Sequence, residues 1–279
     1  MRRAALLLAA LACGDPAARP GAGNATPDAD PGDDDPSAAD GGAAAVWSPA
    51  PGTSWQWQLD GAIDTSYDVA MYDIDLVETP QRIIDELKAD GRVVVCYFSA
   101  GSVESYRPDA GEFPPDAVGM TLDGWPDERW LDTRDPTVRS IMEARLDLAV
   151  ARGCDGVEPD NVDAYANDSG FPLTAADQLD YNRFIAAAAH ARNLSVGLKN
   201  DVEQAAALEP DFDWSLDEEC FRYHECSELT AFIDAGKAVF HVEYGSSDRA
   251  DIVCPSTSPL GFSTLIKRLR LDAWQVACP

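Results

Sequence analysis

The sequence predicts an α/β fold, a (β/α)8 TIM barrel that forms a single domain after a disordered N-terminal tether. Three observations lead to this prediction. Eight short runs rich in β-branched and aromatic residues are spread along the chain, and helical stretches stand between several of them. Setting aside the first 45 residues leaves about 230, a length that suits one barrel-sized domain.

The eight predicted strands are short, and turn-forming residues flank most of them. Because parallel strands need a crossover segment between them, their alternation with helical stretches favours a parallel sheet. The predicted strands are residues 54–59, 69–74, 92–98, 155–160, 194–199, 212–216, 238–243 and 262–267.

Three segments have the periodicity of amphipathic helices. Ile83, Ile84 and Leu87 fall on one face of the first segment. The third segment begins with Thr174 as a plausible N-cap and has Asp177 at its third helical position. The predicted helices are residues 79–90, 137–152 and 174–191.

The predicted barrel is imperfect. The connection from Leu59 to Val69 is too short for a helix, and Pro255 and Pro259 break the crossover after Glu243. An open doubly wound sheet is the alternative. The glycine-rich phosphate-binding turn typical of that fold is absent, because no G-x-G-x-x-G or Walker-type motif follows the first strand.

Residues 1–13 have the pattern of a bacterial lipoprotein signal peptide, with Arg2 and Arg3 before a short apolar run and Cys13 after a small residue. That run is too short to span a bilayer, so we expect membrane contact only through a lipid on Cys13. Simple secretion is the alternative, and either case predicts a protein outside the cytoplasm. Residues 14–45, rich in Asp, Ala, Gly and Pro, predict a disordered acidic linker.

The chain is strongly acidic, with a formal net charge of -28 and a pI near 4.1. Nucleic acid and anionic membrane surfaces would be repelled, so a cationic or neutral ligand fits better. The alternative is that the acidity only supports solubility. The residue pattern leaves the oligomeric state open, and we expect a monomer.

The six cysteines after Cys13 predict disulfides, because an even number in an exported chain favours pairing over metal ligation. Proximity and order along the chain suggest the pairs Cys96–Cys154, Cys220–Cys226 and Cys254–Cys278. We predict no metal and no organic cofactor. The histidines lack the H-E-x-x-H spacing of a zinc site, and the Asp-rich stretch 160–163 lacks the spacing of an EF-hand calcium site. There is also no G-x-S-x-G motif, which argues against a serine nucleophile.

Carboxylates end many of the predicted strands. The carboxyl ends of barrel strands face a common mouth, where burial and mutual repulsion raise some pKa values and leave other acids ionised. Glycoside hydrolysis needs one protonated acid and one charged carboxylate. The alternative for any single acid is helix capping or an ion pair, with Lys199, Arg129 or Arg134 as partner. The strand-end acids are Asp60, Asp73, Asp75, Glu158, Asp160, Asp201, Asp217, Glu218, Glu219 and Glu243.

Several aromatic residues lie at or near the same strand ends. Sugar rings stack on such side chains, although core packing explains any one of them equally well. The aromatic residues are Trp55, Trp57, Tyr72, Tyr97, Trp125, Trp130 and Tyr244.

A dozen ordered motifs resemble glycoside hydrolase family 114, the endo-α-1,4-polygalactosaminidase family, over residues 47–278. They include Trp55-Gln56-Trp57-Gln58-Leu59, Tyr72-Asp73-Ile74-Asp75, Cys96-Tyr97-Phe98-Ser99, Glu158-Pro159-Asp160-Asn161, Gly197-Leu198-Lys199-Asn200-Asp201, Glu218-Glu219-Cys220 and Val242-Glu243-Tyr244. The resemblance implies a TIM barrel that hydrolyses galactosamine-rich polysaccharide.

The resemblance also implies the catalytic residues: Asp160 as nucleophile and Glu218 as general acid/base, in a retaining mechanism. Acids replace the usual Asn and Gln around Glu218, so Glu219 remains an alternative. The implied partner is a cationic galactosamine-containing polysaccharide, and the alternatives are another glycan or a non-catalytic surface lectin. Expected substrate-binding residues are Trp57, Tyr72, Asp73, Tyr97, Asp163, Lys199, Asp201, Glu243 and Tyr244.

Overall fold

The computed structural model describes residues 46–279. The expected signal peptide, the lipidation site at Cys13 and the acidic linker at 14–45 lie outside the described residues. Within the described part of the chain, no helix has the length and apolar character needed to cross a membrane.

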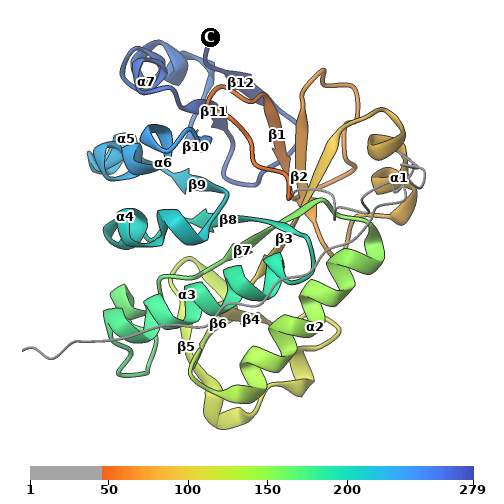
Figure 1. Cartoon of the computed structure of the whole chain (residues 1–279), viewed down its shortest axis with the longest axis vertical. Coiled ribbons are helices and arrows are strands. Elements are labelled where there is room, and N and C mark those ends of the chain that lie inside the picture. The colour runs from red at the N-terminus through yellow and green to blue at the C-terminus, as the bar shows by residue number, and fades with distance from the viewer. Residues whose placement is uncertain (1–45) are drawn as a thin grey trace, which may run out of the picture. The chain divides into compact units, whose positions relative to one another are not determined.

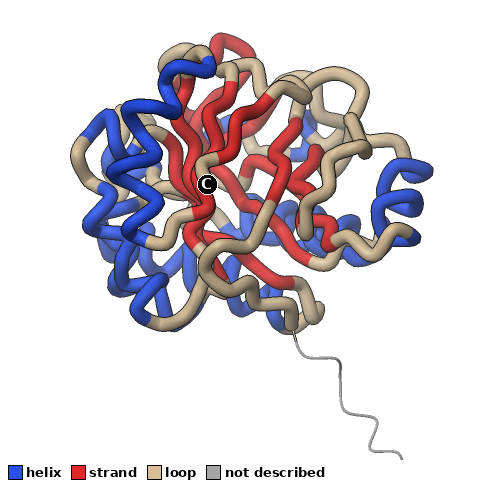
Figure 2. The backbone as a smooth tube through the Cα atoms, turned by 90° about the horizontal axis from the view of Figure 1, so that it is seen from above, coloured by secondary structure: helices blue, strands red, loops and turns tan. Residues whose placement is uncertain are grey.

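A sheet of parallel strands forms the centre of the fold, and all eight predicted strands are confirmed (Figure 1). Figure 2 shows helices lying outside the strands. The strands follow one another in chain order around the sheet: β1 (Trp55–Gln58), β2 (Met71–Asp75), β3 (Val93–Ser99), β7 (Gly156–Asp160), β8 (Ser195–Lys199), β9 (Trp214–Glu218), β10 (Val239–Tyr244) and β11 (Ser263–Lys267).

A ninth strand, β12 (Gln275–Ala277), pairs antiparallel with β11 and stands at the end of the sheet opposite β1. The C-terminal segment and the Gln56 side chain bridge the remaining gap. Leu59 N donates to Leu271 O over 3.1 Å, Gln56 Nε2 donates to Ala273 O over 2.8 Å, and Lys267 Nζ donates to Gln56 Oε1 over 3.0 Å. The barrel is therefore nearly closed, as predicted.

The three predicted helices are confirmed as α1 (Gln81–Ala89), α2 (Pro136–Arg152) and α3 (Ala175–His190). The predicted cap of α3 is a capping box, in which Thr174 and Asp177 each accept from the other's backbone N–H. The remaining crossovers contain only short helices: α4 (Ala205–Leu208), α5 (Cys220–Tyr223), α6 (Thr230–Asp234) and α7 (Ala250–Thr257). No helix follows β1, and α7 runs through Pro255 but ends before Pro259.

A small antiparallel sheet between β3 and α2 was not predicted. Its strands are β4 (Ser102–Glu104), β5 (Val118–Leu122) and β6 (Trp125–Leu131), in the order β4-β6-β5. The turn Asp123-Gly124 joins β5 to β6, with Gly124 at φ 79°, a conformation that glycine adopts without strain.

Alternation along the strands separates two apolar layers. Met71, Trp214 and Phe240 belong to the cluster inside the barrel, whereas Tyr72 belongs to the cluster between strands and helices. The residue two positions after an inward apolar side chain also points inward. Glu218, two residues after the inward-pointing Leu216, therefore points into the mouth of the barrel.

All three predicted disulfides are confirmed: Cys96–Cys154, Cys220–Cys226 and Cys254–Cys278. Cys96 of β3 is joined to Cys154, which lies two residues before the start of β7, so this bond links two neighbouring strands of the barrel.

Candidate active site

A cavity of about 1060 Å³ opens at the carboxyl ends of the strands, where ligands bind in barrels of this kind. Residues at the carboxyl ends of β1, β2, β3, β7, β8, β9 and β10 line it, together with the β4–β6 sheet. Its wall carries ten Asp and Glu side chains and three basic ones. A cavity with this excess of acid favours cations.

Lys199, the last residue of β8, lies between the two predicted catalytic acids. Its Nζ is 3.1 Å from Asp160 Oδ1 and 3.2 Å from Glu218 Oε2. Since β7, β8 and β9 are neighbouring parallel strands, their last residues meet at one edge of the barrel. Burial lowers the pKa of Lys199, but the charges of Asp160, Glu158 and Glu218 outweigh this and raise it. The ammonium therefore stays charged.

A hydroxyl group also holds each acid. Tyr97 Oη donates to Asp160 Oδ2 over 3.1 Å, and Tyr244 Oη donates to Glu218 Oε1. Burial and the neighbouring carboxylates raise the pKa of both phenols well above the usual range, so both remain hydrogen-bond donors. The backbone N–H of Asn161 donates to Asp160 Oδ1 over 2.8 Å.

Asn200 orients Glu218 further. Its Oδ1 accepts from Glu218 N over 3.0 Å, and its Nδ2 donates to Glu218 Oε2 over 3.5 Å. Glu219, the alternative acid, adopts φ 66° and forms an ion pair of 2.7 Å with Arg222. Glu218 is thus the acid that shares Lys199 with Asp160.

A buried layer supports Lys199 from below. Glu158 Oε1 accepts from Lys199 Nζ over 2.9 Å, and Trp57 Nε1 donates to Glu158 Oε2 over 3.0 Å. Burial and the charge of Glu158 raise the pKa of Asp73 well above its usual range. The protonated form of Asp73 is therefore favoured, which reduces the negative charge of this layer.

One group of three potential metal ligands occurs among the described residues: Cys220, Cys226 and His241. The two cysteines form a disulfide with each other, so this group offers no thiolate to a metal ion.

The model of the glycoside-hydrolase family GH114 matches residues 36–279. The chain belongs to glycoside hydrolase family 114. The crystal structure of Aspergillus fumigatus Ega3 in complex with galactosamine is similar, with 43% sequence identity and a TM-score of 0.81 over 85% of this chain and 99% of that chain. The chain is a glycoside hydrolase.

Two further comparisons are more distant. The glycoside hydrolase domain of PelA from Pseudomonas aeruginosa has 13% identity and a TM-score of 0.63 over 80% of this chain and 97% of that one, and it shares the fold. An uncharacterized protein of Deinococcus radiodurans is 30% identical over 178 residues, which are 57% of this chain and 58% of that protein's length.

In this family 114 hydrolase, both predicted catalytic residues and five of the predicted substrate-binding residues line the cavity. These five are Trp57, Tyr97, Asp163, Lys199 and Tyr244. Burial and the charge of Asp160 raise the pKa of Asp163 to about 6.

Tyr72 and Glu243 lie outside the cavity, because they occupy positions whose side chains point outward from the barrel. Tyr72 Oη donates to the carbonyl of Tyr67 over 3.0 Å in the outer apolar layer. Glu243 accepts from Arg222 N over 3.0 Å and from Arg249 Nη2 over 2.8 Å. Despite burial, hydrogen bonds from His241 and Arg249 hold its pKa below the usual range.

Asp73 and Asp201 are also missing from the cavity wall. Asp73 lies beneath Glu158 and is fully buried. Asp201 Oδ2 accepts from Asn182 Nδ2 over 2.9 Å, and burial together with the charge of Asp163 raises its pKa to about 8.

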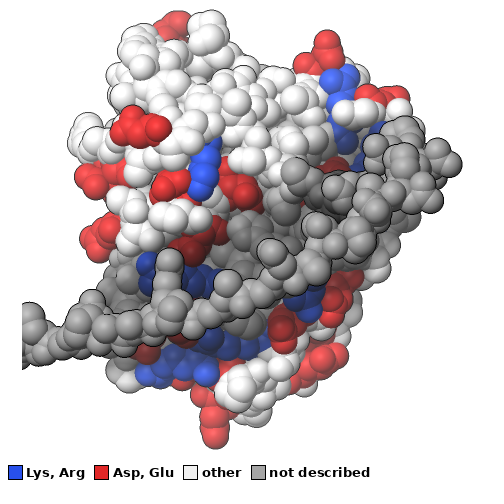
Figure 3. Space-filling view, viewed as in Figure 1, with Lys and Arg blue, Asp and Glu red and all other residues white. Residues whose placement is uncertain are grey.

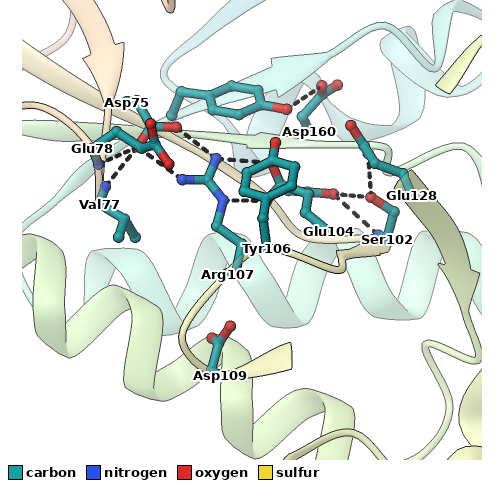
Figure 4. Close-up of polar contacts among 12 residues, drawn as sticks. Asp75, Val77, Glu78, Ser102, Glu104, Tyr106, Arg107, Asp109, Glu128 and Asp160 are labelled. Carbon is teal, nitrogen blue, oxygen red and sulfur yellow. Dashed lines mark hydrogen bonds and ion pairs between the residues drawn. The ribbon is translucent and has the colours of Figure 1, made fainter. Parts of the chain in front are cut away.

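The sequence analysis missed the wall that the β4–β6 sheet contributes. Arg107 donates to both Asp75 and Glu104 in this wall, and Glu128 accepts from Ser102 Oγ over 2.8 Å (Figure 4). The Asp-Gly turn at 123–124 between two short extended runs is the signal that predicts such a hairpin.

Acidic side chains are scattered over the face shown in Figure 3, while Lys and Arg gather near α2 and α3. Arg139 of α2, Arg183 of α3 and Arg192 just after α3 are already ion-paired, with Asp180, Asp211 and Asp147.

Proposed function

We propose that this hydrolase cleaves internal α-1,4-galactosaminidic bonds in a galactosamine-rich polysaccharide, with Asp160 as nucleophile and Glu218 as general acid/base. The observation that carries the proposal is the sharing of Lys199 by these two carboxylates at the mouth of an acidic cavity.

In the first step Glu218 donates a proton to the leaving glycosidic oxygen while Asp160 Oδ attacks the anomeric carbon. The C1–O bond breaks, and a glycosyl ester forms on Asp160. In the second step Glu218 takes a proton from water, the water oxygen attacks C1, and the ester bond to Asp160 breaks. The product keeps the configuration of the substrate.

The shared lysine brings the two carboxylates close together, as a retaining mechanism requires. Asp160 and Glu218 contact the same Nζ atom through oxygens at 3.1 and 3.2 Å. Retaining enzymes hold their carboxyl groups about 5 Å apart, whereas inverting enzymes need about 6.5–9.5 Å to admit a water molecule.

The protein groups around the acids have separate tasks. Tyr97 and Lys199 stabilise the charge of Asp160 as it leaves the ester in the second step. Tyr244 and Asn200 orient Glu218 toward the leaving oxygen. Trp57, Tyr97, Asp163, Lys199 and Tyr244 are the proposed substrate-binding residues among those expected.

The substrate proposal rests on charge and on similarity. Ammonium groups of a deacetylated galactosamine polymer would pair with the acidic wall, and the similar structure of Ega3 holds galactosamine. All three basic residues of the wall are already ion-paired: Arg107, Lys199 and Arg270.

We also propose that the enzyme acts outside the cytoplasm, secreted or anchored through a lipid on Cys13. The three disulfides support this location, because such bonds persist in oxidising compartments.

Product analysis tests the proposal. The purified chain and its Asp160→Asn and Glu218→Gln variants are incubated with polygalactosamine, and the products are measured by mass spectrometry. We expect short oligomers from the unchanged chain only. Oligomers from all three proteins would reject these two acids, and cleavage of a neutral polymer in preference to polygalactosamine would reject the substrate. NMR of the first-formed product checks retention, since inversion would give the β-anomer.

A further inference from the structure

Glu128 is an acid of the cavity wall that the catalytic mechanism does not use. It lies on β6, its side chain is 8% exposed, and it lines the same cavity as Asp160 and Glu218. Its Oε2 accepts from Ser102 Oγ over 2.8 Å. Among the described residues, no side chain or backbone group donates a hydrogen bond to its Oε1, and no cation pairs with it.

The neighbouring acids of this wall are neutralised, which sets Glu128 apart. Glu104 lies directly opposite Glu128 in the β4–β6 ladder. Arg107 donates to both oxygens of Glu104 over 2.7 and 2.8 Å, and to both oxygens of Asp75 over 2.9 and 2.6 Å. Two like charges that face each other on neighbouring strands destabilise a sheet. Arg107 pairs with Glu104 and Asp75, and it does not pair with Glu128.

The free oxygen of Glu128 points toward Asp160 across the cavity (Figure 4). Burial and the charges of Glu104 and Asp160 raise the pKa of Glu128 to about 7. The space between Glu128 and Asp160 is therefore one where a bound cation would relieve repulsion between two carboxylates.

We propose that Glu128 is a specificity-determining residue that binds the 2-ammonium group of the galactosamine unit whose C1 is attacked by Asp160. This inference rests on the proposed function. C2 is bonded directly to C1, so a 2-ammonium group lies close to the nucleophile, and the free oxygen of Glu128 faces Asp160 in the same cavity. An N-acetyl group at C2 carries no charge and is larger, so the contact selects deacetylated units.

The chain offers a matched pair of variants. Glu128→Gln removes the charge but keeps an oxygen that accepts from Ser102. Asp127→Asn removes the same charge from the adjacent residue, whose side chain is exposed and outside the cavity wall. Because Glu128 is a largely buried carboxylate, the amide should leave Tm unchanged or higher.

The test measures kcat/KM on fully deacetylated and on fully N-acetylated polygalactosamine. For Glu128→Gln we expect a fall of roughly 10- to 100-fold on the deacetylated polymer, the effect of losing a hydrogen bond to a charged group, and a fall of less than about threefold on the acetylated one. Asp127→Asn should match the unchanged chain on both. Equal losses on both polymers, or a lowered Tm, would show a structural role and overturn the inference.

A binding measurement separates this inference from the proposed function. A deacetylated galactosamine oligomer is titrated by calorimetry into Glu218→Gln and into the double variant Glu218→Gln/Glu128→Gln. Weaker binding by the double variant, by roughly 10- to 100-fold, supports the role of Glu128 even if the unchanged chain cleaves no polygalactosamine. Equal binding by the two proteins overturns it, whether or not cleavage occurs.

Discussion

Lys199 and Glu158 form an ion pair of 2.9 Å in which neither side chain reaches solvent, with exposed fractions of 1% and 0%. Removing one partner of a buried pair leaves an uncompensated charge and costs about 3–5 kcal/mol. Lys199 is also the cation that lies between Asp160 and Glu218. The same residue therefore contributes to stability and, in the proposed mechanism, to catalysis.

Replacement of this lysine tests both roles. We expect Lys199→Met to lower the free energy of unfolding by about 3–5 kcal/mol and to abolish measurable hydrolysis, because the three carboxyl groups that Lys199 contacts then face one another without a cation. Lys88→Met is the matched control, since Lys88 pairs with Asp155 at the surface, where such pairs contribute at most about 1 kcal/mol. Urea unfolding and steady-state hydrolysis measure the two effects. Similar losses for both variants would contradict the prediction.

The pH dependence of stability tests the environment of Asp201. Burial and the charge of Asp163 raise its pKa in the folded protein from an ordinary 3.8 to about 8. A raised carboxyl pKa contributes stability below the unfolded value, and this is lost as pH rises through the folded value. We therefore expect Asp201→Asn to be more stable than the unchanged chain at pH 9, by about 2 kcal/mol, and this advantage to disappear below pH 4. Thermal unfolding across that range measures it.

Asparagine also suits the backbone at this position, because Asp201 has φ 48° and asparagine tolerates the left-handed region. Asp201 lies outside the cavity wall, so KM should stay unchanged in Asp201→Asn. If the stability advantage did not depend on pH, its cause would be the backbone conformation and not the charge of Asp201. If KM rose, Asp201 would be a substrate-binding residue.

The loop lengths of the disulfides predict different contributions to stability. Cys96–Cys154 closes a separation of 58 residues, and Cys220–Cys226 one of 6. Since the stabilisation grows with the loop that is closed, replacing both cysteines by alanine should cost about 4 kcal/mol for the first bond and about 2 kcal/mol for the second. Denaturant unfolding of the two double variants measures this order, and a reversed order would mean that local packing decides instead.

Trp125 tests the binding surface of the unpredicted sheet. It follows the β5–β6 turn, is 51% exposed and lines the cavity. If a sugar ring stacks on it, Trp125→Ala should raise KM for the polymer roughly 3- to 10-fold with kcat nearly unchanged. Tyr223→Ala is the control, since Tyr223 is 58% exposed but outside the cavity wall. An equal change in the two variants would argue against stacking.

Much of the barrel was predictable from local patterns. Strand composition, helix periodicity and the Thr174 cap each reflect a preference of a few neighbouring residues, and all three were confirmed. Order along the chain was sufficient for the disulfides because each pair joins cysteines that follow one another in sequence.

Whether each strand-end side chain points into or out of the barrel was not predictable in the same way. Barrel strands are buried on both faces, so apolar residues occupy inward and outward positions alike and the alternation does not reveal which face is inside. Tyr72 and Glu243 were therefore expected at the site, whereas their positions on the strands direct them outward.

The sequence by itself determined the eight parallel strands, the three long helices, the acidic strand ends and, through its motifs, the family. Only the tertiary structure decided which acids share a cation. Lys199 comes from one strand, Asp160 and Glu218 from its two neighbours, and Glu128 from a separate sheet. Coulomb interactions depend on distance in space, and the spacing of these residues along the chain does not specify that distance.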